Sequence, residues 1–172
     1  MLYEGGIRVP FIAHWEGEFG RPRREDVPVI GVDLLPTLLE LAGGKPAKKQ
    51  EIDGESIVGV LAREKQELED RAIYWHFPAY LERYRGLPEE GPFRTTPATA
   101  IRSGKWKMIR FYESGHEELY DLEEDVSESE NLAGAYPDVV KKLSLQLDRW
   151  LTDTNAFIPS MPNPDYAGGE SD

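Results

Sequence analysis

The pattern of apolar and polar positions predicts a strand and two helices in the first third of the chain. Residues 7–15 are rich in β-branched and aromatic side chains, which is typical of a buried strand. Residues 34–42 carry leucines around most of a helical circumference, with Asp33 placed as an N-cap and Gly43 after the last turn. Such a helix should be well buried. A short amphipathic helix is expected over residues 56–63.

The middle of the chain predicts a small antiparallel sheet. Residues 71–77 indicate a strand, and residues 81–97 indicate a long irregular loop of the kind that is often functional. A meander of three strands joined by glycine-containing turns should follow. Its strands are expected over residues 98–102, 106–112 and 118–122.

The last helix and the middle strand of the meander predict how the sheet is covered. In that strand Ile109 and Phe111 share one face, whereas Lys107 and Arg110 fall on opposite faces. A helix is expected over residues 137–153, and its apolar stripe should pack on the meander. The stripe consists of Val140, Leu143, Leu147, Trp150 and Leu151.

A highly charged stretch over residues 64–70 marks the expected boundary between two units. We expect residues 1–64 to form the first part, residues 65–154 a unit of antiparallel strands with one long helix, and residues 155–172 an extended tail. The first part should be less protected from exchange than residues 71–154.

Composition and charge argue against several classes of function. The 172 residues include 20 Lys and Arg against 32 Asp and Glu, a net charge of −12. This balance argues against nucleic acid and anionic membrane as partners, because both require a basic surface. The chain has no cysteine, and therefore no disulfide, thiolate metal site or cysteine nucleophile. No apolar stretch approaches the about 20 residues of a transmembrane helix.

The start of the chain places charge beside a flexible turn. Gly5 and Gly6 allow a positive φ or a close backbone approach. Arg8 should pair with Glu4, because a partly buried arginine needs an acidic partner. His14 lies in the expected first strand, and we interpret it as structural.

The acidic run over residues 121–129 superficially resembles a calcium loop. Val126 stands where an EF-hand requires glycine, and Leu132 where it requires a bidentate glutamate. We therefore reject a calcium site and interpret the run as turns and caps, with Asn131 ordering the entry to the last helix.

The chain also carries a series of sequence blocks in a fixed order. They are Tyr3-Glu4-Gly5-Gly6-x-Arg8-x-Pro10, Asp33-x-x-Pro36-Thr37-x-Leu39-x-x-x-Gly43, Asp53-Gly54-x-Ser56, Tyr74-Trp75-His76-Phe77-Pro78, Arg102-x-Gly104-x-Trp106-Lys107, Glu118-Leu119-Tyr120-x-Leu122 with Glu130-Asn131-Leu132, and Pro162-x-Pro164-x-Tyr166. In wording and order these blocks resemble the C-terminal portion of an arylsulfatase-like, formylglycine-dependent sulfatase, in the form found in bacterial members.

The resemblance implies a partial α/β fold of the alkaline-phosphatase-like sulfatase type. Residues 1–64 would belong to the edge of the large catalytic domain, and the later strands and helix to a C-terminal α+β subdomain. The full-length family uses calcium and a formylglycine made in a Cys/Ser-x-Pro-Ser-Arg motif to hydrolyse sulfate esters. This chain carries neither that motif nor the metal-binding segments. It is therefore expected to be inactive alone and to need the rest of a catalytic domain as its partner, with a periplasmic or secreted location for the full-length protein.

Five residues are candidates for contact with a sulfated small molecule or glycan. His76 would reach the mouth of the catalytic cleft, or would be a strand-end histidine satisfied by the backbone. Tyr80, Arg83 and Arg85 would line the same mouth, or would be solvated surface. Arg102 would present positive charge to a sulfated sugar together with Lys105 and Lys107, or all three would decorate an exposed hairpin.

A second interpretation makes the chain a stand-alone carbohydrate-binding or structural module without catalysis. Aromatic side chains that could stack on sugars favour it, namely Trp75, Tyr80, Tyr84 and Trp106. The apolar residues of 7–15 and of 34–41 oppose it, because they would need cover from a partner.

Overall fold

The computed structural model describes residues 2–19, 22–63, 68, 71–82, 93–161 and 163. By its contacts the chain divides into two compact units. Unit 1 comprises residues 1–9 with 72–172, and unit 2 comprises residues 10–71. The expected boundary near residue 64 therefore does not apply to the first nine residues, which pack with the C-terminal strands.

Unit 1 is built on a four-stranded antiparallel sheet with the order β1-β4-β5-β6. The strands are β1 (Ala72–Phe77), β4 (Ala98–Ser103), β5 (Trp106–Phe111) and β6 (Glu117–Asp121). A two-residue turn joins β4 to β5, and Gly104 adopts a positive φ of 58° there. The expected meander is thus present. A two-stranded sheet of β2 (Leu81–Glu82) and β3 (Phe93–Thr95) lies within the segment expected to be irregular.

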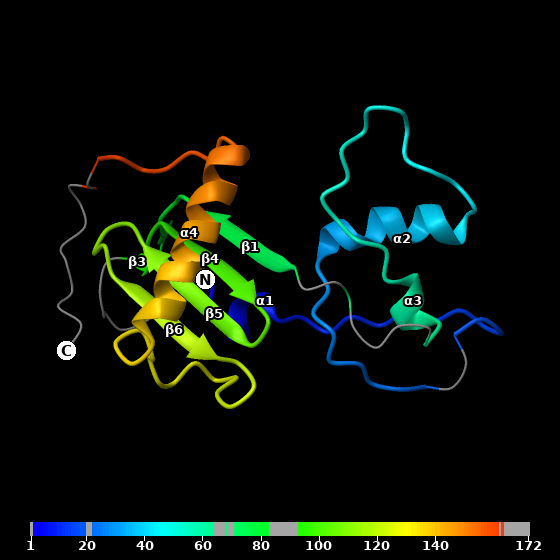
Figure 1. Cartoon of the computed structure of the whole chain (residues 1–172), viewed down its shortest axis with the longest axis horizontal. Helices are drawn as coiled ribbons and strands as arrows, with labels where there is room; N and C mark the ends of the chain where they lie inside the picture. Colours follow the sequence, from blue (N-terminus) through cyan, green and yellow to red (C-terminus); the bar gives the residue numbers. More distant parts are fainter. Residues whose placement is uncertain are drawn as a thin grey trace. The chain divides into compact units, whose positions relative to one another are not determined.

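One helix, α4 (Pro137–Asp153), covers one face of the four-stranded sheet (Figure 1). Its leucines pack against Ile101, Met108 and Leu119, and Tyr74 of β1 stacks on Trp150 at a ring-centroid distance of 4.7 Å. The expected stripe is confirmed: Val140 and Trp150 are partly buried at its edge, and the fully packed members are Leu143, Leu147 and Leu151.

The first residues of the chain cover part of the other face of the sheet. Leu2 packs with Ala98, Ala100, Ile109 and Tyr120. These strand residues share the face opposite α4, because alternate residues of a strand point to opposite faces. Directly after Leu2 the chain forms α1 (Glu4–Ile7), a single helical turn. Gly5 has no heavy atom within 4 Å of an added Cβ, so no close approach requires it.

The expected strand over residues 7–15 is not formed. Residues 8–15 have no regular structure, and Val9, Phe11, Ile12 and Trp15 are exposed. The physical reason is that a strand needs a neighbouring strand for its backbone hydrogen bonds, and none lies beside this segment in the described part of the chain. The apolar composition of residues 7–15 indicates that the segment tends to be buried, but it does not identify a strand that would pair with it.

Unit 2 contains the 3-10 turn η1 (Gly31–Asp33) and the helices α2 (Leu34–Leu41) and α3 (Val58–Leu61). Helix α2 ends as expected: Gly43 has φ 64°, and its N–H donates to Glu40 while that of Gly44 donates to Leu39. The expected burial of α2 is wrong for this chain. Thr37 is its buried residue, whereas Leu34, Leu35 and Leu38 are 43%, 45% and 61% exposed.

Asp33 holds unit 2 together. Its side chain does not cap α2. Instead, its buried carboxylate accepts hydrogen bonds from the backbone N–H groups of Ile30 (2.8 Å) and Glu55 (3.0 Å) and from Arg71. Thr37 adds a further link, because its hydroxyl accepts from the N–H of Ile57 at 3.1 Å.

The contact between the Gly54 segment and the backbone of Val32 and Asp33 requires a glycine at position 54. A Cβ at this position would lie 2.1 Å from the carbonyl oxygen of Val32 and 2.7 Å from the nitrogen of Asp33. The Asp53-Gly54-x-Ser56 block therefore packs its backbone directly on the segment that precedes α2. Within the described ranges, no helix has the length and apolar composition needed to cross a membrane.

Candidate functional site

His76 lies near the end of β1, with both ring nitrogens engaged inside the protein. Its Nε2 is 2.8 Å from the carbonyl oxygen of Phe157, which can only accept, so Nε2 carries the proton. In the neutral ring Nδ1 then accepts from the Thr99 hydroxyl at 2.7 Å, and Thr99 accepts from the Tyr112 hydroxyl at 2.6 Å. His76 thus holds the residues after α4 against the sheet. A contact with substrate at this residue stays a prediction.

The other candidates are placed as follows. Tyr80 is partly buried between β1 and β2. Arg83 and Arg85 lie outside the described residues. Arg102 is partly buried on β4, where its Nε donates to the carbonyl oxygen of Gly104 at 3.4 Å. The segment after α4 contacts His76 through the backbone of Phe157, whose side chain is 71% exposed.

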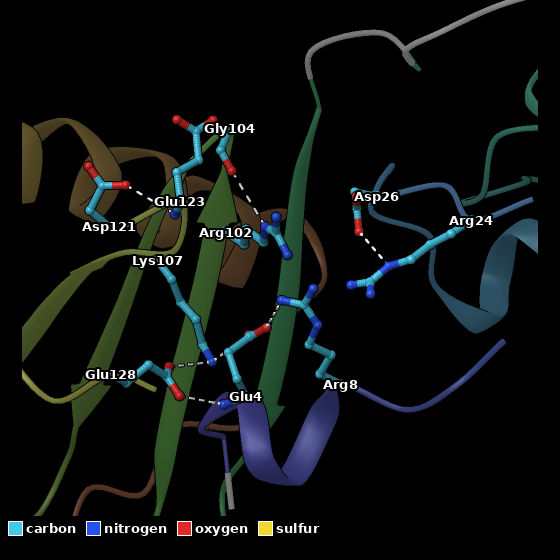
Figure 2. A network of polar contacts seen from close by, with 10 residues as sticks. All are labelled: Glu4, Arg8, Arg24, Asp26, Arg102, Gly104, Lys107, Asp121, Glu123 and Glu128. Carbon is cyan, nitrogen blue, oxygen red and sulfur yellow. Dashed lines mark hydrogen bonds and ion pairs between the residues drawn. The ribbon is translucent and has the colours of Figure 1, made fainter. Parts of the chain in front are cut away.

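Lys107 is the fully buried cation of a charged network on the face of the sheet that also carries Arg102 (Figure 2). Its Nζ lies 3.0 Å from Oε1 of Glu4 and 2.7 Å from Oε1 of Glu128. The other carboxylate oxygen of Glu128 accepts from the backbone N–H of Glu4. Arg8 completes the network, because its guanidinium lies 3.5 Å from Oε2 of Glu4, as the sequence predicted.

This network joins three segments that are distant in sequence: α1, β5 and the loop after β6. The backbone of Glu128 adopts φ 56°, a left-handed conformation that is unfavourable for a residue with a side chain. Its two contacts, with Lys107 and with the N–H of Glu4, compensate for that cost. Lys107 is therefore neither part of an exposed hairpin surface nor available to a sugar, so both interpretations of this residue are wrong. Lys105 is paired as well, because its Nζ lies 2.5 Å from Oδ2 of Asp121.

The acidic loop after β6 uses its carboxylates for turns. Asp125 accepts from the hydroxyls of Ser127 and Ser129 and from the backbone N–H groups of Ser129 and Glu130. Asn131 accepts from the N–H of Leu119, which ties the loop to β6 ahead of α4. In the described part of the chain, no three His, Asp or Glu side chains gather as a bound metal ion would require.

Comparison with known proteins decides the family. A family model described as N-sulphoglucosamine sulphohydrolase, C-terminal, matches residues 1–153. The chain belongs to the sulfatase family, as a C-terminal portion. A sulfatase of Formosa agariphila is 35% identical to this sulfatase portion in an alignment of 169 residues, which covers 90% of the chain and 29% of that relative.

Solved structures agree with this family and give the fold. A structure described as a 2-O GAG sulfatase is 28% identical, with a TM-score of 0.58, over 77% of this chain and 27% of its own. A second, described as a complex with its substrate D-glucosamine-2-N,6-O-disulfate, is 28% identical with a TM-score of 0.52, over 70% and 23%. The sulfatase portion thus has a partial alkaline-phosphatase-like α/β fold. It spans less than a third of the length of these relatives.

Proposed function

We propose that this chain is the C-terminal part of a sulfatase that hydrolyses sulfate esters of a glycan. It supplies the C-terminal sheet and helix, the last part of the catalytic α/β domain, and substrate-pocket residues. The formylglycine nucleophile and the calcium ligands belong to protein outside this sequence, and the chain alone is inactive. The match of the family model over residues 1–153 carries this proposal.

A glycan is the proposed substrate class because of what the similar structures are described as binding. One is a GAG sulfatase, and another holds a disulfated glucosamine. Both similarities extend over most of this chain, 77% and 70% of it. Such substrates carry sulfate and carboxylate groups, which arginine side chains recognise through paired hydrogen bonds.

The rest of a catalytic domain is the proposed partner of unit 2. The partner would cover the apolar side chains of the segment before residue 16 and of α2, which would otherwise stay in contact with water. We infer that residues 10–63 belong to the catalytic domain and that the strands and α4 form the C-terminal subdomain. The exposed side chains that support this inference are Phe11, Ile12, Trp15, Val32, Leu34, Leu35 and Leu38.

Among the proposed substrate residues, Arg102 has the geometry best suited to an anion. His76, Tyr80, Arg83 and Arg85 remain proposals from the resemblance. The alternative of a stand-alone carbohydrate-binding module has less support. Trp75 packs against the core, and Trp106 packs against Tyr136 with ring centroids 5.0 Å apart, so both tryptophan rings make contacts within the protein.

A chimeric enzyme tests the proposal. The region of the Formosa agariphila sulfatase that aligns with this chain is replaced by this chain, and release of inorganic sulfate from sulfated disaccharides is measured. The parent enzyme and the same enzyme truncated before this region are the controls. We expect the chimera to release sulfate and the truncated enzyme not to. A chimera that unfolds at the parent's temperature but releases no sulfate would contradict the proposal.

A further inference from the structure

Three cationic side chains gather on one face of the four-stranded sheet. Arg102 of β4 and Lys107 of β5 are directly paired across the strands, and Arg8 follows α1 on the same face (Figure 2). Like charges directly opposite each other in a sheet are unfavourable. Lys107 is neutralised, because it contacts the carboxylates of Glu4 and Glu128. Among the residues that the structure describes, Arg102 has no such carboxylate partner.

The guanidinium of Arg102 differs from the other partly buried guanidinium groups. Arg71 donates two hydrogen bonds to Asp33, and Arg110 contacts both Glu117 and Asp148. Within the described ranges, Arg102 has no carboxylate at ion-pair distance, and its single hydrogen bond uses Nε. The two NH₂ groups of its fork therefore have no acceptor there, although the side chain is partly removed from water.

The pKa values of these three arginines differ in the same way as their contacts. Hydrogen bonding by Asp33 raises the pKa of Arg71, and the carboxylates of Glu117 and Asp148 outweigh burial to raise that of Arg110. For Arg102, burial lowers the pKa and the nearby charge of Arg8 lowers it further, so the charges of Glu4 and Glu123 do not compensate. An additional negative charge at Arg102 would therefore be favourable.

Arg8 places a second guanidinium next to the first. Figure 2 shows the guanidinium groups of Arg8 and Arg102 facing one another, with Glu4 holding Arg8 from one side. The Arg8 side chain is 48% exposed, so a ligand can reach it from water. Two guanidinium groups that face each other repel, and Glu4 offsets only part of this repulsion, because it also pairs with Lys107. A tetrahedral oxyanion has enough oxygens to accept hydrogen bonds from both guanidinium groups.

We propose that Arg8 and Arg102 together bind one sulfate group of a sulfated sugar. This inference rests on the proposed sulfatase function and extends it by assigning Arg8, in the Tyr-Glu-Gly-Gly-x-Arg block, to substrate recognition. The oxygens of the sulfate accept from the free N–H groups of Arg102 and from Arg8. Glu4 acts as a positioning residue, because it contacts both Arg8 and Lys107.

Sulfate titration of the full chain tests this site directly. Sodium sulfate is added at constant ionic strength, with chloride as the balancing anion, since exposed charges are screened by salt. The Nε–Hε resonances of the arginines are followed by NMR. We expect Arg102 and Arg8 to shift together with one dissociation constant, and Arg102→Gln to weaken sulfate binding at least about tenfold.

Two further variants sharpen the test. Arg102→Lys keeps the charge but loses the planar fork, and it should also weaken binding. Arg149→Gln is the matched control, because it removes an exposed arginine from α4, the helix on the other face of the sheet, and should leave binding unchanged. Equal losses in Arg102→Gln and Arg149→Gln, or no shift of Arg102, would overturn the proposal and indicate non-specific ion binding.

The chimeric enzyme separates this inference from the proposed function. In an active chimera, Arg102→Gln and Arg8→Gln should each raise the KM for a sulfated disaccharide, and Arg149→Gln should not. An active chimera with an unchanged KM in both variants would remove the sulfate site and leave the sulfatase proposal intact. A folded but inactive chimera that still binds sulfate at Arg102 would contradict the sulfatase proposal and leave the sulfate site intact.

Discussion

Arg71 donates two hydrogen bonds to the carboxylate of Asp33, at 2.6 and 2.5 Å, where the chain leaves unit 2. The Asp33 side chain is 1% exposed. Burial acts to raise the pKa of Asp33, but Arg71 and the N–H groups of Glu55 and Ile30 outweigh it, so the pKa lies below its ordinary value. A charged Asp33 is therefore the centre on which α2, the Gly54 segment and Arg71 meet.

Asp33→Asn should open unit 2. The amide cannot replace the bidentate ion pair, and Arg71 would be left partly buried without its partner, at a cost of roughly 3 kcal/mol. Hydrogen exchange of the Ile30 and Glu55 amides, and proteolysis within residues 22–63, should both accelerate. Asp26→Asn is the control, because Asp26 is 76% exposed and should matter by less than about 0.5 kcal/mol. Equal effects of the two substitutions would show that Asp33 is not the centre.

Gly54→Ala should disturb the same junction without changing charge. The new Cβ would lie 2.1 Å from the Val32 carbonyl oxygen, so the backbone has to move, which typically costs about 1–3 kcal/mol. Exchange of the Asp33 amide, which donates to Ile30, reports that movement. Gly31→Ala in the same unit is the control, since an added Cβ there has no heavy atom within 4 Å. Unchanged exchange in Gly54→Ala would contradict the close packing.

Lys107→Met should destabilise unit 1 strongly. The substitution leaves Glu4 and Glu128 buried without their cation, which costs roughly 3–5 kcal/mol. Urea unfolding followed by circular dichroism measures the loss. Lys105→Met removes the cation of a more exposed pair with Asp121 and should have a much smaller effect. The triple variant Glu4→Gln/Lys107→Met/Glu128→Gln should recover much of the stability, and a failure to recover any would show that packing, not charge, dominates.

Acid stability should depend on Asp125. Hydrogen bonds from the Glu130 amide and from Ser127 and Ser129 lower the pKa of Asp125 from 3.8 to about 2. A carboxyl with a lowered pKa stabilises the fold above its unfolded pKa, and that contribution is lost as pH falls through the folded value. Unfolding measured from pH 5 to pH 2 should therefore lose stability mainly below about pH 4. Asp125→Asn should flatten this slope, and an unchanged slope would contradict the assignment.

The sequence predicted the four strands of the main sheet and the long helix α4. Strands β1, β4, β5 and β6 follow from alternation and from Gly104, and α4 follows from its leucine stripe and Pro137. The opposite faces of Lys107 and Arg110 were also predicted correctly, because Lys107 meets Glu4 and Arg110 meets Asp148. The strands, their turns and the alternation of their faces depend on residues that are close together in the sequence.

The sequence did not predict features that depend on distant partners. A lysine on a strand next to a turn is usually exposed, so the burial of Lys107 could not be seen without knowing that Glu128 faces it. A signal was present, since Lys107 shares a face with the apolar Ile109 and Phe111. The strand expected over residues 7–15 did not form, because its apolar pattern gives no information about the strand that would pair with it.

Hydrogen exchange on the isolated chain tests the central claim most directly. If the chain is the C-terminal part of a larger sulfatase domain, residues 10–63 should exchange much faster than residues 98–153, because their apolar surface lacks its cover. Residues 4–8 should follow the slow group, since Glu4 and Lys107 join them to the sheet. Strong, uniform protection across both units would contradict the account and favour a self-sufficient module.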